Sequence, residues 1–288
     1  MFTRVLVPTD LSGSAKKNLV CLTRIPGIKE IILQHIVDAT HETKRGWTHE
    51  PHIANARMQL DEEKDFLEHS GFTVRVIIDV MRSGDIPMKI LRTAEREDIS
   101  LIVMGSRRKG RIKSLLFGSV SDAVVRQGKT HVLIIPNDLA EKFEGPIIDK
   151  HCPGLFSRIL CPVDVSEPAA NIVPLCKDID KSGTIHLLHV ITKGETREEI
   201  DAKIASVKTN LEEIKTALTD EGHPVKVHVR LGQKCDEIIA FAEEIDASLI
   251  LLSSNKKISL KDHFIKNTTA GVVTQTKRPL MVVRALSQ

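Results

Sequence analysis

The chain repeats one series of short apolar runs twice, and this duplication constrains its fold more than any other feature. The first half contains five strand-like runs, Arg4–Asp10, Glu30–Asp38, Thr73–Asp79, Leu101–Ser106 and His131–Pro136. The second half contains five more in the same order, Arg158–Asp164, Thr184–Ile191, Val225–Leu231, Leu249–Ser254 and Leu280–Arg284. The register is specific, because Gly84 and Gly232 lie 148 positions apart, as do Leu133 and Met281. A period of about 150 residues is typical of a duplicated domain and not of a solenoid.

Helix-like patterns separate these runs. In Thr196–Gly222 the apolar residues recur at spacings of four and three, which predicts a helix with one buried face, and Ala54–Gly71 is its counterpart in the first half. Strands that alternate with helices predict βαβ units and a mostly parallel sheet. We therefore predict an α/β protein of two tandem doubly wound domains, each with five strands and with helices on both faces. We expect the first domain to span residues 1–137, the linker 138–156 and the second domain 157–288.

The composition agrees with this fold and excludes several classes of protein. Only 3% of the residues are aromatic, so the core must be aliphatic, as the strands of a buried parallel sheet usually are. A net charge of +3 is too small to indicate nucleic-acid binding. The five cysteines form no C-x-x-C pair, which argues against a disulfide framework or a zinc site and favours a reducing compartment. No run approaches 18 apolar residues, so we expect a cytoplasmic protein without a membrane span.

The residues that follow the first strand are candidates for ligand binding. In an open parallel sheet, ligands bind beyond the carboxyl ends of the strands, where the strand order reverses. The first strand-like run ends in Pro8, Thr9 and Asp10, and Asp164 recurs after the matching run of the second half. The Asp10 carboxylate suits a ribose hydroxyl or a base amine as a donor, but a turn or helix cap is the alternative explanation of this residue.

The loop after the fourth strand is the strongest indication of a phosphate site. It runs from Gly105 to Gly118, and five of its residues are basic, Arg107, Arg108, Lys109, Arg111 and Lys113. Gly118 and Ser119 open the next predicted helix, whose free backbone N–H groups attract phosphate. The chain has neither a Walker sequence nor a G-x-G-x-x-G after its first strand, which argues against a dinucleotide-dependent dehydrogenase. A solvated basic loop without a ligand is the alternative.

Four motifs give the chain a resemblance to a known family. They are P-T-D at residues 8–10, Q-H-I-V-D at 34–38, V-M-G-S at 103–106 and F-G-S-V-S-D at 117–122. With them the chain resembles the universal stress protein family in its tandem two-domain form, over nearly its whole length. This resemblance implies the strand order 3-2-1-4-5 in each domain. It also implies an adenine nucleotide, ATP or AMP, as the ligand, with Mg²⁺ accompanying ATP.

The resemblance also implies which residues would hold the nucleotide. Those on the adenosine side would be Pro8, Thr9, Asp10, Ile36, Met104 and Gly105, with the Ile36 backbone against adenine and Met104 and Gly105 beside the ribose. Those on the phosphate side would be Gly118, Ser119 and Val120. The family's pattern places a glycine three positions after the first one, where this chain has Arg108, next to Arg107. A guanidinium contact would then replace a backbone contact with phosphate.

The second half departs further from the family's pattern. Ser253 stands at the position of Gly105, and Lys266 and Asn267 stand at the positions of Gly118 and Ser119. We therefore predict that this half binds nucleotide weakly or not at all and serves as a built-in partner. The resemblance implies pairing of the last strands, around Leu133 and Val282, within the chain or across a homodimer, because bare apolar sheet edges invite pairing.

Three functional hypotheses remain open from the sequence. The favoured one is a nucleotide-binding regulatory protein of the stress response. The second is a slow ATP-hydrolysing or phosphoryl-transfer enzyme, which the absence of any recognisable Ser-His-Asp or Cys-His arrangement disfavours. The third is a nucleotide-free protein that uses its basic loop to bind an acidic partner. The sequence does not separate ATP from AMP.

Overall fold

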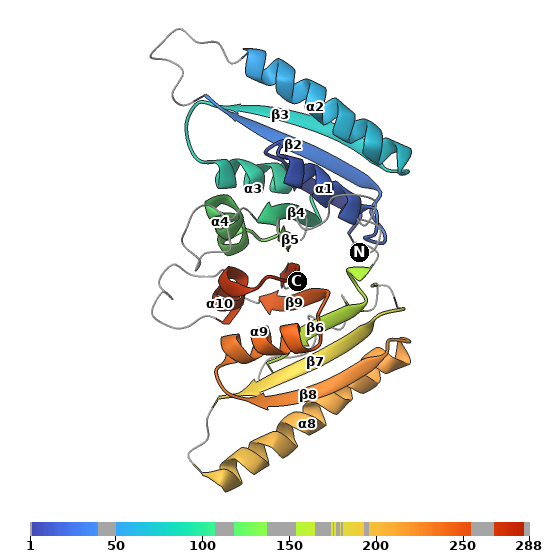
Figure 1. The fold of residues 1–288 in the computed structure, drawn as a ribbon, viewed down its shortest axis with the longest axis vertical. Coiled ribbons are helices and arrows are strands. Elements are labelled where there is room, and N and C mark those ends of the chain that lie inside the picture. The colour runs from blue at the N-terminus through green and yellow to red at the C-terminus, as the bar shows by residue number, and fades with distance from the viewer. Residues whose placement is uncertain are drawn as a thin grey trace. The chain divides into compact units, whose positions relative to one another are not determined.

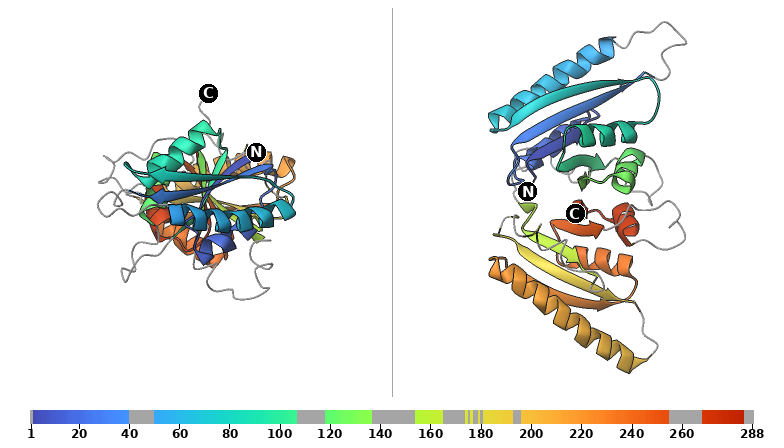
Figure 2. Two further views of the ribbon diagram at one scale, coloured as in Figure 1. Left: turned by 90° about the horizontal axis from the view of Figure 1, so that it is seen from above. Right: turned by 180° about the vertical axis from the view of Figure 1, so that it is seen from behind.

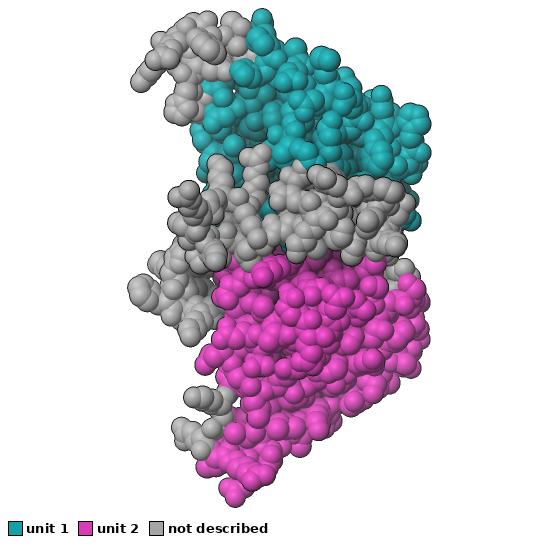
Figure 3. Space-filling model, in the orientation of Figure 1, with its two compact units in different colours: residues 1–109, 117–152 teal, residues 110–116, 153–288 magenta. Residues whose placement is uncertain are grey.

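The structure of the 288-residue chain is a computed structural model, shown as ribbons in Figures 1 and 2. It describes residues 2–39, 50–106, 118–136, 154–164, 181–192, 196–254 and 268–284, together with Pro174, Cys176 and Ile179. The described residues fall into two compact units (Figure 3), unit 1 from residue 2 to 136 and unit 2 from residue 154 to 284.

Unit 1 is a doubly wound α/β domain with a fully parallel sheet. Its strands pair in the order β3-β2-β1-β4-β5, which confirms the order implied by the sequence. Aliphatic side chains fill its core, with Val5, Ile32 and Leu133 fully buried. The elements in chain order are β1 (Arg4–Pro8), α1 (Gly13–Leu22), β2 (Glu30–Asp38), α2 (Glu50–His69), β3 (Thr73–Met81), α3 (Ile86–Arg96), β4 (Leu101–Ser106), α4 (Ser119–Gln127) and β5 (His131–Pro136).

Unit 2 repeats this topology. Its strands pair in parallel in the order β10-β9-β6-β7-β8, which is the order of unit 1 with the matching strands. The described elements in chain order are β6 (Arg158–Pro162), β7 (Thr184–Ile191), α8 (Arg197–Asp220), β8 (Val225–Leu231), α9 (Lys234–Glu244), β9 (Leu249–Ser254), α10 (Thr268–Gln275) and β10 (Leu280–Arg284). The predicted duplication of one α/β domain is therefore confirmed.

Helices cover both faces of the unit 1 sheet. Gln34 on β2 donates a hydrogen bond to the Thr93 hydroxyl of α3 at 2.8 Å, so this side chain faces α3. Neighbouring residues of a strand point to opposite faces, so His35 points to the face that α1 and α2 cover. In Figure 1, α2 lies along β2 and β3, and both strands contact it.

Several elements begin or end away from the positions that the sequence predicted. Helix α2 starts at Glu50, four residues before the predicted start, because Pro51 is tolerated in a first helical turn and Glu50 suits the positive end of the helix. Strand β1 ends at Pro8 and not at Asp10, because the chain turns there. The Asp10 carboxylate accepts a hydrogen bond from the Ser12 backbone N–H at 2.9 Å, and Ser12 caps α1.

The central strands of each unit pair over a short stretch only. Strands β1 and β4 pair through Val5 with Leu101 and Leu6 with Ile102, whereas β4 and β5 pair along their full length. Unit 2 shows the same limited pairing between β6 and β9. Each unit therefore has two central strands that separate toward their carboxyl ends, which is where the strand order reverses.

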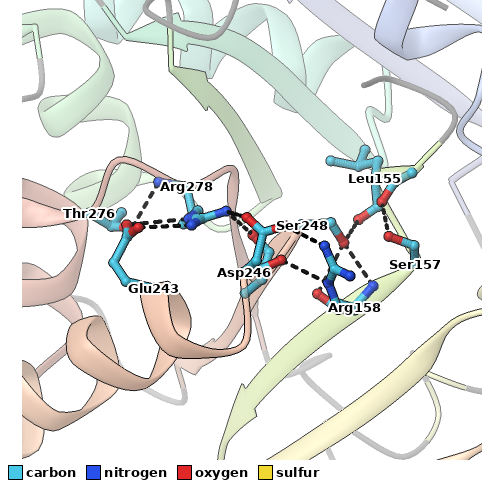
Figure 4. Close-up of polar contacts among 10 residues, drawn as sticks. Leu155, Ser157, Arg158, Glu243, Asp246, Ser248, Thr276 and Arg278 are labelled. Carbon is cyan, nitrogen blue, oxygen red and sulfur yellow. Dashed lines mark hydrogen bonds and ion pairs between the residues drawn. The ribbon is translucent and has the colours of Figure 1, made fainter. Parts of the chain in front are cut away.

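A serine joins the amino ends of these central strands in both units, an arrangement that we call the serine clasp. In unit 2 the Ser248 hydroxyl accepts a hydrogen bond from the Arg158 backbone N–H at 2.9 Å, and its own proton lies between two acceptors, the Leu155 carbonyl at 2.9 Å and the Arg158 carbonyl at 3.0 Å (Figure 4). In unit 1 the Ser100 hydroxyl accepts from the Arg4 N–H at 3.2 Å and donates to the Arg4 carbonyl at 2.8 Å. The clasp compensates for the short pairing by fixing the start of each central strand.

Four of the five cysteines lie within the described residues. Cys21 is disulfide-bonded, whereas Cys161, Cys176 and Cys235 are free thiols. One bonded cysteine is not a disulfide framework, so the expectation against such a framework stays a prediction. Within the described residues, no helix has the length and apolar character needed to cross a membrane.

The serine clasp predicts two matched changes in local stability. We expect Ser248→Ala to lower the free energy of unfolding of unit 2 by about 1–2 kcal/mol, because the Arg158 N–H loses its partner. Hydrogen exchange measured by mass spectrometry should show faster exchange in peptides of β6 and β9. Ser100→Ala serves as the reciprocal control and should affect β1 and β4 alone. Equal effects of either variant on both units would contradict a local clasp.

Candidate functional site

The carboxyl end of β1 is shaped by hydrogen bonds of three consecutive residues. The Thr9 N–H donates to the Gln34 carbonyl at 2.8 Å and so adds one bond to the β1–β2 ladder. The Thr9 hydroxyl then accepts from the Leu11 N–H at 3.0 Å, and Leu11 has a left-handed φ of 61°. Asp10 thus has the turn role that the sequence left as the alternative. Pro8 and Thr9 support this turn and do not line the adjacent cleft.

A cleft of about 410 Å³ opens beside this turn. Its walls come from the connection after β1, the end of β2 and the first turns of α2, and the lining residues are Asp10, Leu11, His35, Ile36, Val37, Asp38, His52, Asn55, Ala56 and Gln59. The volume lies within the range of small-molecule sites. Asp10 and Ile36, both predicted as site residues, are therefore brought together in one cleft.

The backbone of Ile36 faces the side of β2 where β1 has ended. In a strand, the main-chain N–H and C=O of alternate residues point to the same side. The Gln34 carbonyl points to β1, where it accepts from Thr9, so the polar groups of Ile36 point to the same side two residues further on. His35 holds the end of β1 in place, because its Nδ1 lies 2.9 Å from the Thr9 carbonyl oxygen. A planar group in the cleft would meet the β2 backbone at Ile36, beyond the end of β1.

The other predicted residues lie at the end of the neighbouring strand β4. Met104 is buried, and the Gly105 carbonyl accepts a hydrogen bond from the Ser121 hydroxyl of α4 at 3.2 Å. This bond holds the first turn of α4 at the carboxyl edge of the sheet. Met104 and Gly105 are not among the residues that line the cleft.

Helix α4 begins without a side-chain cap. Its N-cap is Gly118, which makes no side-chain hydrogen bond, whereas α1 and α3 are capped by Ser12 and Asp85. The backbone N–H groups of Ser119 and Val120 belong to the first turn, which carries the partial positive charge of the helix. This arrangement suits an anion that brings its own acceptor oxygens. Arg107 and Arg108 lie outside the described residues.

Sequence reasoning missed the contribution of α2. Residues 52, 55, 56 and 59 all line the cleft, and their spacings of three, one and three place them on one face of the helix. That spacing was the available signal.

A buried acid on the same helix was also missed. Glu63 lies one turn beyond Gln59, its side chain is only 3% exposed, and within the described chain neither of its carboxylate oxygens has a hydrogen-bond partner. Burial raises the pKa of the Glu63 carboxyl to about 7. The positive charge of Lys16 opposes this shift, and the negative charges of Asp10 and Glu62 add to it. Lys16 itself is 2.9 Å from a Glu62 carboxylate oxygen.

The corresponding edge of unit 2 differs in its charge. The geometry at the strand ends is repeated, because His189 Nδ1 lies 2.8 Å from the Val163 carbonyl oxygen. However, the Asp164 carboxylate forms an ion pair with Lys234 at 3.0 Å. Lys234 is the first residue of α9, and the matching position in unit 1 is Ile86. Ser253 is described at the end of β9, whereas Lys256, Lys266 and Asn267 lie outside the described residues.

Comparisons with known proteins agree with the fold and the motifs. The model of the universal stress protein family matches residues 1–136 and 155–284. The chain is 29% identical over 157 residues to universal stress protein MJ0577 of Methanocaldococcus jannaschii, which covers 47% of this chain and 95% of that protein. It is 27% identical over 146 residues to universal stress protein G of Escherichia coli O157:H7, covering 45% of this chain and all of that protein. The crystal structure of a universal stress protein from Archaeoglobus fulgidus is similar with a TM-score of 0.73 and 27% identity, over 98% of both chains.

The buried Glu63 predicts a pH-dependent stability. Its folded-state pKa of about 7 lies above its ordinary value of 4.5, so the folded protein binds more protons between these values. The preference of the folded state for protonated Glu63 therefore adds fully to the free energy of unfolding below about pH 4.5. This addition, about 3 kcal/mol in total, is lost as the pH rises through about 7. We expect Glu63→Gln to remove this loss.

The measurement is urea unfolding at several pH values, followed by the fluorescence of the single tryptophan, Trp47, in the first half of the chain. The matched control is Glu68→Gln, which removes the same charge from an exposed position of α2. The control should keep the wild-type dependence on pH. A wild-type stability that does not fall from about pH 5 to about pH 8 relative to Glu63→Gln would show that Glu63 is ionised at little cost.

Proposed function

The chain belongs to the universal stress protein family, and from this premise we propose that it is a stress-response regulatory protein whose first unit binds an adenine nucleotide. The observation that carries the proposal is the cleft between β1, β2 and α2, which opens at the same sheet edge as the uncapped start of α4. Ligands of open α/β sheets bind at this edge, at the point where the strand order reverses. The two features accommodate the two parts of a nucleotide.

The adenosine part fits the cleft. The base would lie against the Ile36 backbone, whose N–H and C=O match the donor and acceptor pattern of a purine edge. The Asp10 carboxylate would accept a hydrogen bond from a ribose hydroxyl or the base amine while it keeps its bond to the Ser12 N–H. Leu11, Val37 and Ala56 supply apolar surface to the same cleft.

The phosphates fit the start of α4. Gly118 has no Cβ, so an oxygen can approach the N–H groups of Ser119 and Val120 closely. In the proposal, Arg107 and Arg108 add charge-assisted contacts from the loop between Gly105 and Gly118. The described residues contain no group of three His, Cys, Asp or Glu side chains suited to a metal ion. Any Mg²⁺ would therefore be bound mainly through the phosphates of ATP.

Unit 2 is proposed as a copy that does not bind nucleotide. The ion pair with Lys234 occupies the Asp164 carboxylate, which is the counterpart of Asp10. A nucleotide would have to displace this lysine before the carboxylate accepted a ligand hydroxyl. The sequence adds a second reason, because Ser253 and Lys266 replace the glycines at positions 105 and 118, and glycine is the residue that allows a phosphate to approach the backbone most closely.

Gly118→Glu tests the phosphate site. We expect it to weaken ATP and AMP binding at least about tenfold, because it places bulk and negative charge at the helix start. Calorimetric titration of the full chain measures the affinity. The matched control is Thr268→Glu, which makes the same charge change in the first turn of α10 and should leave the affinity unchanged. An unchanged affinity in Gly118→Glu would remove α4 from the site.

The stoichiometry of the same titration tests the proposal that unit 1 binds nucleotide and unit 2 does not. We expect one nucleotide per wild-type chain, and the Gly118→Glu variant should lose that site. Two equivalent sites would mean that the Lys234–Asp164 pair does not prevent binding. Binding of neither ATP nor AMP would overturn the proposed function.

A further inference from the structure

Glu63 is the most unusual buried group beside the proposed nucleotide site. It continues the buried face of α2, whose other buried residues are Ala56, Leu60 and Leu67. Ala56 lines the cleft, and Glu63 lies two turns further along the same face. A carboxyl group at a position that otherwise carries apolar residues is costly unless it is paired or neutral. Neither of its oxygens has a hydrogen-bond partner within the described residues.

The charges around Glu63 come from three segments. Lys16 of α1, Asp10 of the β1–α1 connection and Glu62 of α2 itself act on it electrostatically. Lys16 is shared, because its ammonium group pairs with the exposed Glu62. On the strands beneath α2, Arg75 and Asp79 of β3 bond to groups on the α3 side of the sheet.

The face of the strands that α2 covers adds little charge. The residues of β3 that alternate with Arg75 and Asp79 are apolar, Val74, Val76, Ile78 and Val80. On β2 the titratable residue of that face is His35, whose Nδ1 contacts the Thr9 carbonyl oxygen. Asp10 is thus a negative group of the proposed ligand site whose charge raises the pKa of Glu63.

We propose that Glu63 couples nucleotide affinity to pH, so that unit 1 binds its nucleotide more tightly when this carboxyl is protonated. The inference rests on the proposed function, whose site it regulates. An ionised Glu63 would add a buried, poorly solvated negative charge close to the exposed Asp10 and, in the complex, to an anionic nucleotide. Like charges raise each other's free energy most where water is excluded. Protonation of Glu63 removes this repulsion.

The coupling is reciprocal. If protonation of Glu63 strengthens nucleotide binding, then nucleotide binding must raise the pKa of Glu63 by the equivalent amount. Because the pKa of the free protein is already about 7, the carboxyl changes its charge within the physiological range of pH. Binding at neutral pH is then accompanied by proton uptake.

The test is calorimetric titration of the full chain with ATP from about pH 5.5 to about pH 8.5. We expect the wild-type dissociation constant to rise about three- to tenfold more over this range than that of Glu63→Gln. ATP's own phosphate titration is common to both proteins and cancels in the comparison. Glu68→Gln, which removes an exposed charge from the same helix, should follow the wild type. Parallel profiles of wild type and Glu63→Gln would overturn the coupling while leaving the proposed function intact.

A second measurement keeps the inference testable if Glu63→Gln folds poorly. Carboxyl carbon NMR of the wild-type chain with labelled glutamate follows the Glu63 titration directly. We expect its midpoint to rise by about half to one pH unit when ATP is present. A midpoint that ATP leaves unchanged would overturn the coupling. Absence of ATP binding at every pH in wild type and variants would instead overturn the proposed function, and this inference with it.

Discussion

The short pairing between β1 and β4 is the constraint on which the ligand edge of unit 1 depends. Only two residue pairs join these strands, Val5 with Leu101 and Leu6 with Ile102. Beyond them β1 ends and turns at Asp10, so the next polar groups of β2 have no strand beside them on that side. The serine clasp makes this separation possible, because it fixes the amino ends of the same two strands where the pairing is formed. The serine clasp and the proposed ligand site thus lie at opposite ends of one strand pair.

Both units share this backbone arrangement. They differ in the surroundings of the aspartate that follows the first strand, Asp10 in unit 1 and Asp164 in unit 2. In unit 1 Asp10 lines an open cleft and influences the buried Glu63. In unit 2 Lys234 pairs with Asp164. Both aspartates are exposed, so this ion pair acts mainly through the positive charge that it places beside the carboxylate. Unit 1 has Ile86 at the position of Lys234 and therefore lacks that charge.

The sequence predicted the parts of the structure that depend on local patterns. Apolar runs located the ten strands of the described residues, and the glycine at position 118 located the start of α4, because both signals are carried by adjacent residues. The cleft-lining face of α2 and the pairing of Lys234 with Asp164 depend on contacts between segments far apart in the chain. The burial of Glu63 could not be predicted from the sequence for a related reason. A glutamate in a helix is ordinarily exposed, and only the packing of α2 shows that this one is buried.

Glu63 joins the stability of unit 1 to its proposed ligand. An apolar residue at this position would complete the buried face of α2 and remove the cost of ionising a buried acid. With glutamate, the folded state and the nucleotide complex both favour the same protonated carboxyl. A fall in pH through about 7 therefore strengthens the fold and the proposed binding together, and a rise weakens both. In this proposal a single proton site affects both the stability of unit 1 and its affinity for nucleotide, because the same carboxyl must be neutral for each to be greatest.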